Sequence, residues 1–157
     1  MTTEYADVTQ VPAEARRSSP SPVSHAPVVV AIVNTNPDLV RIMRMSLERA
    51  GFVVFEIHIE DIKLGSANVD SFLRQHDPKV VVYDLAPPYD MNWRFLDHLR
   101  NATGFAGRQF VLTSMNARHA ERAVKGDESV YEILGEEKDM AEVVRAVKEA
   151  SRSRPTR

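Results

Sequence analysis

The stretch VVVYDLAPPYD, residues 80–90, decides the fold that this sequence predicts. Its first four residues are apolar or aromatic, which is typical of a strand buried on both faces of a sheet. The run ends at Asp84, and a turn containing Pro87 and Pro88 follows. These two prolines stiffen the turn and favour a preset loop over a mobile one. We therefore ask which other residues a carboxylate at the end of a buried strand requires.

Four other segments have the composition of buried strands. They are rich in valine, isoleucine and phenylalanine, as strands in parallel sheets are. With residues 79–85 they make five predicted strands: 28–33 (VVVAIV), 52–59 (FVVFEIHI), 79–85, 109–114 (QFVLTS) and 130–134 (VYEIL).

Apolar residues at helical spacing separate these strands. Asn36 is a good N-cap with Pro37 at the first helical position, and Gly51 stands where a C-terminal glycine belongs. Trp93 is expected to pack against the core. The remaining helices are predicted at residues 69–75, 93–100 (opened by Asp90 or Asn92), from Asn116 to 124, and over the apolar stripe between residues 140 and 150.

Five strands alternating with about five helices predict an α/β fold, a doubly wound five-stranded parallel sheet covered on both faces. In such sheets, ligands bind outside the carboxyl ends of the strands. The candidate pocket is therefore formed by the residues that follow the strands: Asn34, Thr35, Asn36, Asp84, Ala86, Thr113, Ser114, Gly135 and Glu136.

Length and composition indicate one domain of ordinary size, with 157 residues and 43% hydrophobic residues. The net charge of −2 excludes a polycation built for nucleic acid. The absence of cysteine excludes disulfides, thiolate zinc sites and a cysteine nucleophile, and it is compatible with the cytoplasm. No apolar run is long enough to span a membrane. We expect a disordered tail at residues 1–27, a domain at 28–150, and a basic tail at 151–157.

The segments AIVNTNPDLVRIMRMSLERAGF, PKVVVYDLAPP and FVLTS, in this order, resemble the receiver domain of two-component response regulators over residues 28–150. The resemblance implies a flavodoxin-like fold. It also implies that Asp84 is the candidate phospho-acceptor, that Thr113 contacts the phosphoryl group, and that Ser114 is the small residue that usually follows.

The positions of the metal-binding acids depart from the family pattern. Receivers hold Mg²⁺ with two acidic residues after the first strand, and here the matching residues are Asn34 and Thr35. Mg²⁺ prefers carboxylate oxygens, so we expect no metal site. Hydrogen bonds from Asn34, Thr35 or Thr113 could then satisfy Asp84 without a metal.

The positions after the fifth strand depart as well. The resemblance implies a lysine there, but the matching residue is Glu136, or Leu134 if the alignment slips by two. Lys138 is not expected to fold back into this place. The aromatic switch residue of the family falls on Ile133, or on Tyr131 with the slip.

Other classes of site fit the sequence less well. A Rossmann nucleotide site needs a glycine-rich turn after the first strand, and VNTNPD has no glycine. The five histidines show no metal-ligand spacing. The last two helices carry mixed charges, which suit a protein partner better than DNA. This predicted partner surface comprises Arg118, Glu121, Arg122, Glu142, Arg145 and Lys148.

These observations predict an atypical receiver domain that acts as a protein-interaction module in signalling, without Mg²⁺-dependent phosphorylation and without enzymatic activity beyond self-phosphorylation on Asp84 at most. Its partner would be a histidine kinase or an output protein, or a second copy bound through the last two helices. One alternative is a working phospho-receiver that uses Mg²⁺ to accept a phosphoryl group on Asp84 from a histidine kinase. Another is a sensor that binds a small molecule in the strand-end cleft.

Overall fold

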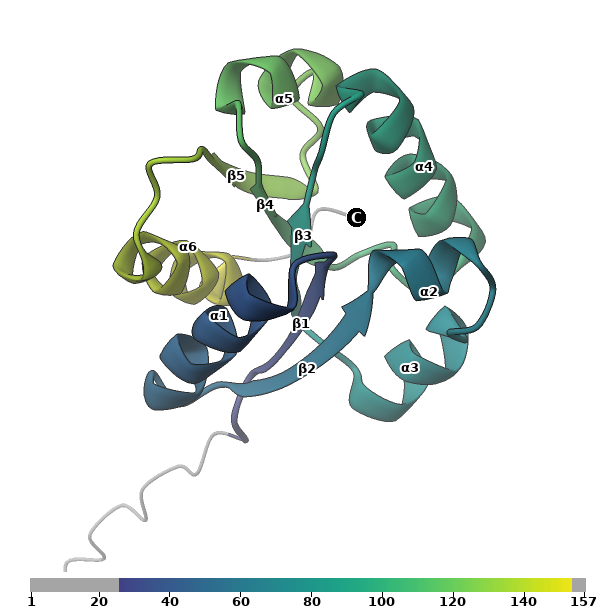
Figure 1. Ribbon diagram of the computed structural model, residues 1–157. Helices are drawn as coiled ribbons and strands as arrows, with labels where there is room; N and C mark the ends of the chain where they lie inside the picture. The colour runs from purple at the N-terminus through teal and green to yellow at the C-terminus, as the bar shows by residue number, and fades with distance from the viewer. Residues whose placement is uncertain (1–25, 154–157) are drawn as a thin grey trace, which may run out of the picture.

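The computed structural model describes residues 26–153, and its five strands form one parallel sheet in the order β2-β1-β3-β4-β5 (Figure 1). The predicted doubly wound sheet is therefore confirmed. The predicted tails, residues 1–27 and 151–157, lie mostly outside the described residues. The strands are β1 (Val29–Asn34), β2 (Val53–His58), β3 (Val80–Asp84), β4 (Gln109–Thr113) and β5 (Val130–Leu134).

Helices cover both faces of this sheet (Figure 1). α1 and α6 pack on one face, and α2 to α5 lie on the other. Within residues 26–153, no helix has both the length and the apolar composition of a membrane span. The helices are α1 (Pro37–Arg49), α2 (Ile59–Lys63), α3 (Val69–His76), α4 (Tyr89–Ala102), α5 (Ala117–Val124) and α6 (Met140–Arg152).

Strand β3 runs through the centre of the sheet. Its residues are almost all apolar because both of its faces are covered. Val80 and Val82 belong to the core beneath α1 and α6. Val81 and Tyr83 belong to the core on the opposite face. Successive side chains of a strand point to opposite faces, so a central strand covered on both sides has no exposed position. Asp84 is the first residue of this run to reach the edge of the core.

Two predicted helix caps are confirmed. The Asn36 side-chain oxygen accepts hydrogen bonds from the backbone N–H groups of Asp38 and Leu39 at the start of α1. The Asn116 side-chain oxygen accepts one from the His119 N–H, at 3.1 Å. Both asparagines satisfy N–H groups that have no partner inside the helix.

Helix α2 differs from the sequence prediction, which gives residues 52–59 as one continuous strand. The strand ends at His58, and α2 begins at Ile59. Ile59 is buried and Ile62 is half-buried against the same core. Two apolar residues three positions apart are enough to anchor one helical turn, but they are too few to show a period in the sequence.

The predicted start of α4 was wrong. The helix begins at Tyr89 after Pro88, which provides no side-chain cap. Neither Asp90 nor Asn92 caps it, since both lie inside the helix. The Asn92 side-chain nitrogen instead donates a hydrogen bond back to the Ala86 carbonyl, at 2.8 Å. This bond ties the loop after Asp84 to the first turn of α4.

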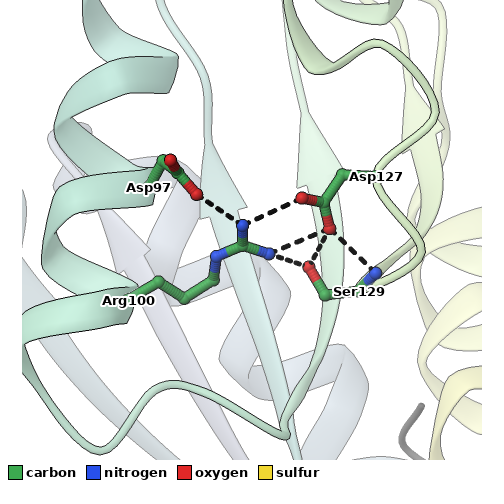
Figure 2. Close-up of polar contacts among 4 residues, drawn as sticks. All are labelled: Asp97, Arg100, Asp127 and Ser129. Carbon is green, nitrogen blue, oxygen red and sulfur yellow. Dashed lines mark hydrogen bonds and ion pairs between the residues drawn. The ribbon is translucent and has the colours of Figure 1, made fainter. Parts of the chain in front are cut away.

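Farther along α4, a cluster of polar side chains around Arg100 joins this helix to the turn before β5 (Figure 2). The Arg100 guanidinium binds the carboxylates of Asp97 and Asp127 and the hydroxyl of Ser129. It also lies over the ring of Trp93, 5.4 Å from the ring centroid. Trp93 itself packs against the core, as predicted.

Candidate functional site

The candidate site lies at the carboxyl edge of the sheet, where β1, β3 and β4 end side by side. Asp84 is opposite Thr113 in the register of β3 and β4. Val33 is opposite Tyr83 in the register of β1 and β3, which places Asn34 beside Asp84. The parallel sheet therefore brings Asn34, Asp84 and Thr113 together, as the sequence predicted.

Asp84 is half-buried and hydrogen-bonded. The Thr113 hydroxyl donates to its Oδ1 atom at 2.8 Å. Burial raises the pKa of the Asp84 carboxyl, because the charged form loses its hydration. The bond from Thr113 and the positive charge of Lys138 act in the opposite direction, and the resulting pKa is still above its ordinary value.

Lys138 lies closer to the site than the sequence led us to expect. Its side chain folds back over the turn after β5, where the ammonium group donates to the Gly135 carbonyl at 3.3 Å. The Lys138 backbone N–H donates to the same carbonyl, at 3.2 Å. From this position its positive charge acts to lower the pKa of the Asp84 carboxyl. The side chain thus turns back toward the end of β5, which the sequence did not lead us to expect, although its ammonium group contacts Gly135 and makes no hydrogen bond to Asp84 within residues 26–153.

Asn34 is almost completely buried, with 1% of its surface exposed. Its side-chain oxygen accepts hydrogen bonds from the N–H groups of Thr35 and Asn36, at 2.6 and 2.9 Å. Its side-chain nitrogen has no partner among the described residues. The amide oxygen is thus engaged in holding the loop after β1, while the amide nitrogen remains an unused donor beside Asp84.

The other predicted pocket residues have more peripheral places. Thr35, Asn36, Ala86 and Glu136 are exposed at the rim. Ser114 is buried, and its hydroxyl oxygen accepts the N–H of Asn116 at 3.2 Å. These residues belong to the loops around Asp84, and within residues 26–153 the hydrogen bond to its carboxylate comes from Thr113 instead.

This set of side chains suits Mg²⁺ poorly. In residues 26–153, no three histidine, aspartate or glutamate side chains are grouped so that they could hold a metal ion. Asp84 supplies one carboxylate, and the amide oxygen of Asn34 already accepts two hydrogen bonds. A small hard cation that prefers several carboxylate or water oxygens has little to bind here.

The end of β5 places the two candidates for the aromatic switch position, Ile133 and Tyr131, in different surroundings. Leu112 is opposite Ile133, and Thr113 is opposite Leu134. Ile133 is half-buried against the core of the α2–α5 face. Tyr131 is 39% exposed, and its hydroxyl donates to the carboxylate of Glu149 on α6 at 3.1 Å.

The predicted partner surface divides between two helices. Arg118, Glu121 and Arg122 are exposed on α5. On α6, Glu142 forms a capping box with Asp139. The other two α6 residues differ in their contacts.

Arg145 binds Glu132 at 2.9 Å and Glu149 at 3.1 Å. Lys148 is exposed and makes no ion pair with a residue in the described range. The α6 half of this surface is therefore partly neutralised by contacts inside the molecule.

No family model and no curated protein matches this sequence. Solved structures do match its fold. A sensor protein from Polaromonas sp. JS666 is 20% identical, with a TM-score of 0.61 over 79% of this chain and 95% of that one.

Two further structures are similar at lower identity. A response regulator from Thermotoga maritima is 14% identical, with a TM-score of 0.62 over 82% of this chain and 100% of that one. The chemotaxis response regulator CheY4 of Vibrio cholerae is 12% identical, with a TM-score of 0.61 over 80% and 99%. The chain therefore has the flavodoxin-like fold of response regulator receiver domains.

Proposed function

We propose that this chain is an atypical receiver domain that works as a protein-interaction module in signal transduction, and that its strand-end pocket acts without Mg²⁺-dependent phosphorylation. The receiver fold supports the signalling role. The contacts of Asp84 support the second part. The observation that carries it is the amide of Asn34 beside Asp84, where a metal ion would need a carboxylate.

The argument about the metal rests on charge. Phosphoryl transfer to a carboxylate needs a metal ion and fixed donors to offset the negative charge that develops in the transition state. Asn34 offers a neutral amide, and its oxygen is already bonded to the backbone of the next two residues. A metal would be held by Asp84 and water, so its affinity should be low.

The argument about a preset pocket rests on hydrogen bonds. Thr113 and Lys138 already stabilise the Asp84 carboxylate. Asn92 holds the Ala86 carbonyl in the loop that follows. Asp84 therefore has partners from within the chain, and the Asn92 bond anchors the loop that follows it.

In this proposal the domain acts through its surface. The partner is another signalling protein, either a kinase or an output protein, or a second copy bound through α5 and α6. The exposed charges on α5, among them Arg118 and Arg122, are available for such contacts. We place the protein in the cytoplasm and assign it no catalytic turnover, as parts of the same proposal.

The test is an amide NMR titration of the full chain with Mg²⁺ and beryllofluoride, a mimic of the phosphoryl group. We expect the signals of Asp84, Thr113 and Lys138 to stay in place. The matched control is the double variant Asn34→Asp/Thr35→Asp, which supplies the two missing carboxylates. We expect this variant to bind Mg²⁺ and to show shifts around Asp84.

The second candidate function is a working phospho-receiver, and the position of Lys138 favours it, because this residue supplies a cation near Asp84. Shifts in the unmodified protein that disappear in Asp84→Ala would establish that function and overturn our proposal. A small-molecule sensor stays a prediction, to be tested by ligand-dependent thermal shifts.

A further inference from the structure

A groove with a cavity of about 600 Å³ lies between α1 and α6, which run side by side on one face of the sheet (Figure 1). Ser46 and Arg49 line it from α1. Met140 and Val144 line it from α6, and both are half-buried, so they form an apolar floor. This groove lies outside the strand-end site.

The rim of the groove is positively charged. Arg49, Lys148 and Arg152 are exposed, and none of them pairs with a carboxylate within residues 26–153. Arg145 and Glu149 also line the groove, but they form an ion pair at 3.1 Å, so their charges offset each other. Three cations are therefore left facing solvent around an apolar floor.

Exposed apolar residues on α1 extend this surface. Ile42 is 51% exposed and Met45 is 45% exposed. They precede Ser46 and Arg49 by four residues each, so they lie on the same side of the helix as the groove-lining residues. The groove and these two side chains together make a surface that fits a segment carrying both apolar and acidic residues.

The chain itself contains such a segment. Residues 2–14 read TTEYADVTQVPAE, with three acidic residues and no lysine or arginine. Tyr5, Val8 and Val11 recur every third position. The same face of a second chain would fit the groove less well, because the three cations of one copy would then face the three cations of the other.

The chain enters the described fold close to this groove. The Val28 carbonyl accepts a hydrogen bond from the Val53 N–H at 3.1 Å, at the start of β2 and four residues after Arg49 ends α1. Thirteen residues, 15–27, separate the acidic segment from Val28. Extended, they span up to about 43 Å, whereas α6, with 13 residues, is about 20 Å long. The segment can therefore reach the whole groove.

We propose that residues 2–14 bind in the groove between α1 and α6. Their apolar side chains rest on Met140, Val144 and the exposed residues of α1. Their carboxylates face Arg49, Lys148 and Arg152. Because the segment is tethered, its effective concentration at the groove is in the range of about 1 mM, so weak contacts suffice to occupy it. The bound segment covers Lys148, and a partner that docks there must displace it.

The chain has no cysteine, so one introduced thiol can be labelled without side reactions. We would attach a nitroxide spin label at Thr9→Cys in the full chain and record the broadening of backbone amide signals. We expect strong broadening of Ser46, Val144 and Lys148. The triple variant R49E/K148E/R152E should abolish this broadening, since it replaces the three cations with carboxylates.

The matched control is R74E/R94E/R118E. It reverses three exposed arginines on α3, α4 and α5 that also lack ion pairs with described residues, and it should leave the broadening unchanged. Broadening limited to residues near Val28 and Val53 in the labelled protein would overturn the proposal.

A mixture of ¹⁵N-labelled chain without spin label and spin-labelled ¹⁴N chain tests the tether. Broadening of the groove in this mixture would show that the segment of a second copy occupies it, which would overturn intramolecular binding. Neither of these two contrary results would bear on the proposal for the strand-end pocket, because the variants alter no pocket residue.

Discussion

Arg100 and Asp127 lie 27 positions apart in the chain, yet the guanidinium of one donates two hydrogen bonds of 2.9 Å to the carboxylate of the other (Figure 2). Only 12% of the Arg100 side chain is exposed. Paired hydrogen bonds between an arginine and a carboxylate are both strong and directional. The pair therefore holds the turn between α5 and β5 against α4, beside a surface that we propose for partners.

Asp127→Asn is expected to destabilise the protein by about 1–3 kcal/mol, since it leaves a largely buried guanidinium with a weaker partner. The measurement is urea unfolding followed by circular dichroism at pH 7. The matched control is Asp77→Asn, which weakens the 2.8 Å pair of Asp77 with Arg108. Asp77 is 85% exposed, so this change should cost less than about 1 kcal/mol. Equal losses in the two variants would contradict the structural role of Arg100.

The same pair predicts a loss of stability in acid. Hydrogen bonds from Arg100 hold the pKa of the Asp127 carboxyl well below its ordinary value. The folded state therefore binds this proton less readily than the unfolded state, whose aspartates titrate near pH ~4. The stabilisation is complete above that pH and is lost as the pH falls further. Urea midpoints between pH 7 and pH 3 should fall less steeply for Asp127→Asn, and parallel curves would argue against this linkage.

The Asp84 carboxylate, unlike that of Asp127, should lower the free energy of unfolding at neutral pH. Burial raises its pKa, so the charged form is less favourable in the folded state than in the unfolded state. Asp84→Asn is thus expected to increase the free energy of unfolding at pH 7, while Thr113 can still donate to the new amide oxygen. The gain should shrink as the pH falls and Asp84 takes up its proton. A loss of stability at pH 7 would mean that the carboxylate is better satisfied than its burial indicates.

Lys138→Met is expected to raise the pKa of Asp84 further, because it removes the cation that stabilises the carboxylate. The measurement is an NMR titration of the Asp84 carboxyl carbon in the full chain. Lys138→Arg keeps the charge and should give a smaller shift. The control Lys125→Met alters an exposed lysine at the end of α5 and should leave the titration unchanged. An unaltered Asp84 titration in Lys138→Met would remove Lys138 from the site.

Local sequence patterns predicted most of the elements and part of the site. Strands β3 and β5 are plain in the sequence because they are short apolar runs bounded by turns, and the caps Asn36 and Asn116 act on their own backbone neighbours. The meeting of Asn34, Asp84 and Thr113 followed from the parallel sheet, since the carboxyl ends of its strands share one edge. These features depend on neighbours in the chain or on a repeating geometry.

Other features could not be read from the sequence. Helix α2 contains a single short turn, and α4 begins without a side-chain cap. The bond from the Lys138 side chain to the Gly135 carbonyl depends on how the turn after β5 folds and on the rotamer of a long side chain. Hydrophobic periodicity does not report on either of these.

The sequence by itself determined the parallel sheet, its order of elements and the place of Asp84, because periodicity and capping act over a few residues. Only the tertiary structure decided which charges meet. Arg100 joins Asp127, the charge of Lys138 acts on Asp84, and within residues 26–153 three cations around the groove between α1 and α6 have no carboxylate partner. The physical reason is that charge pairing depends on distances of a few ångströms between residues that packing alone brings together.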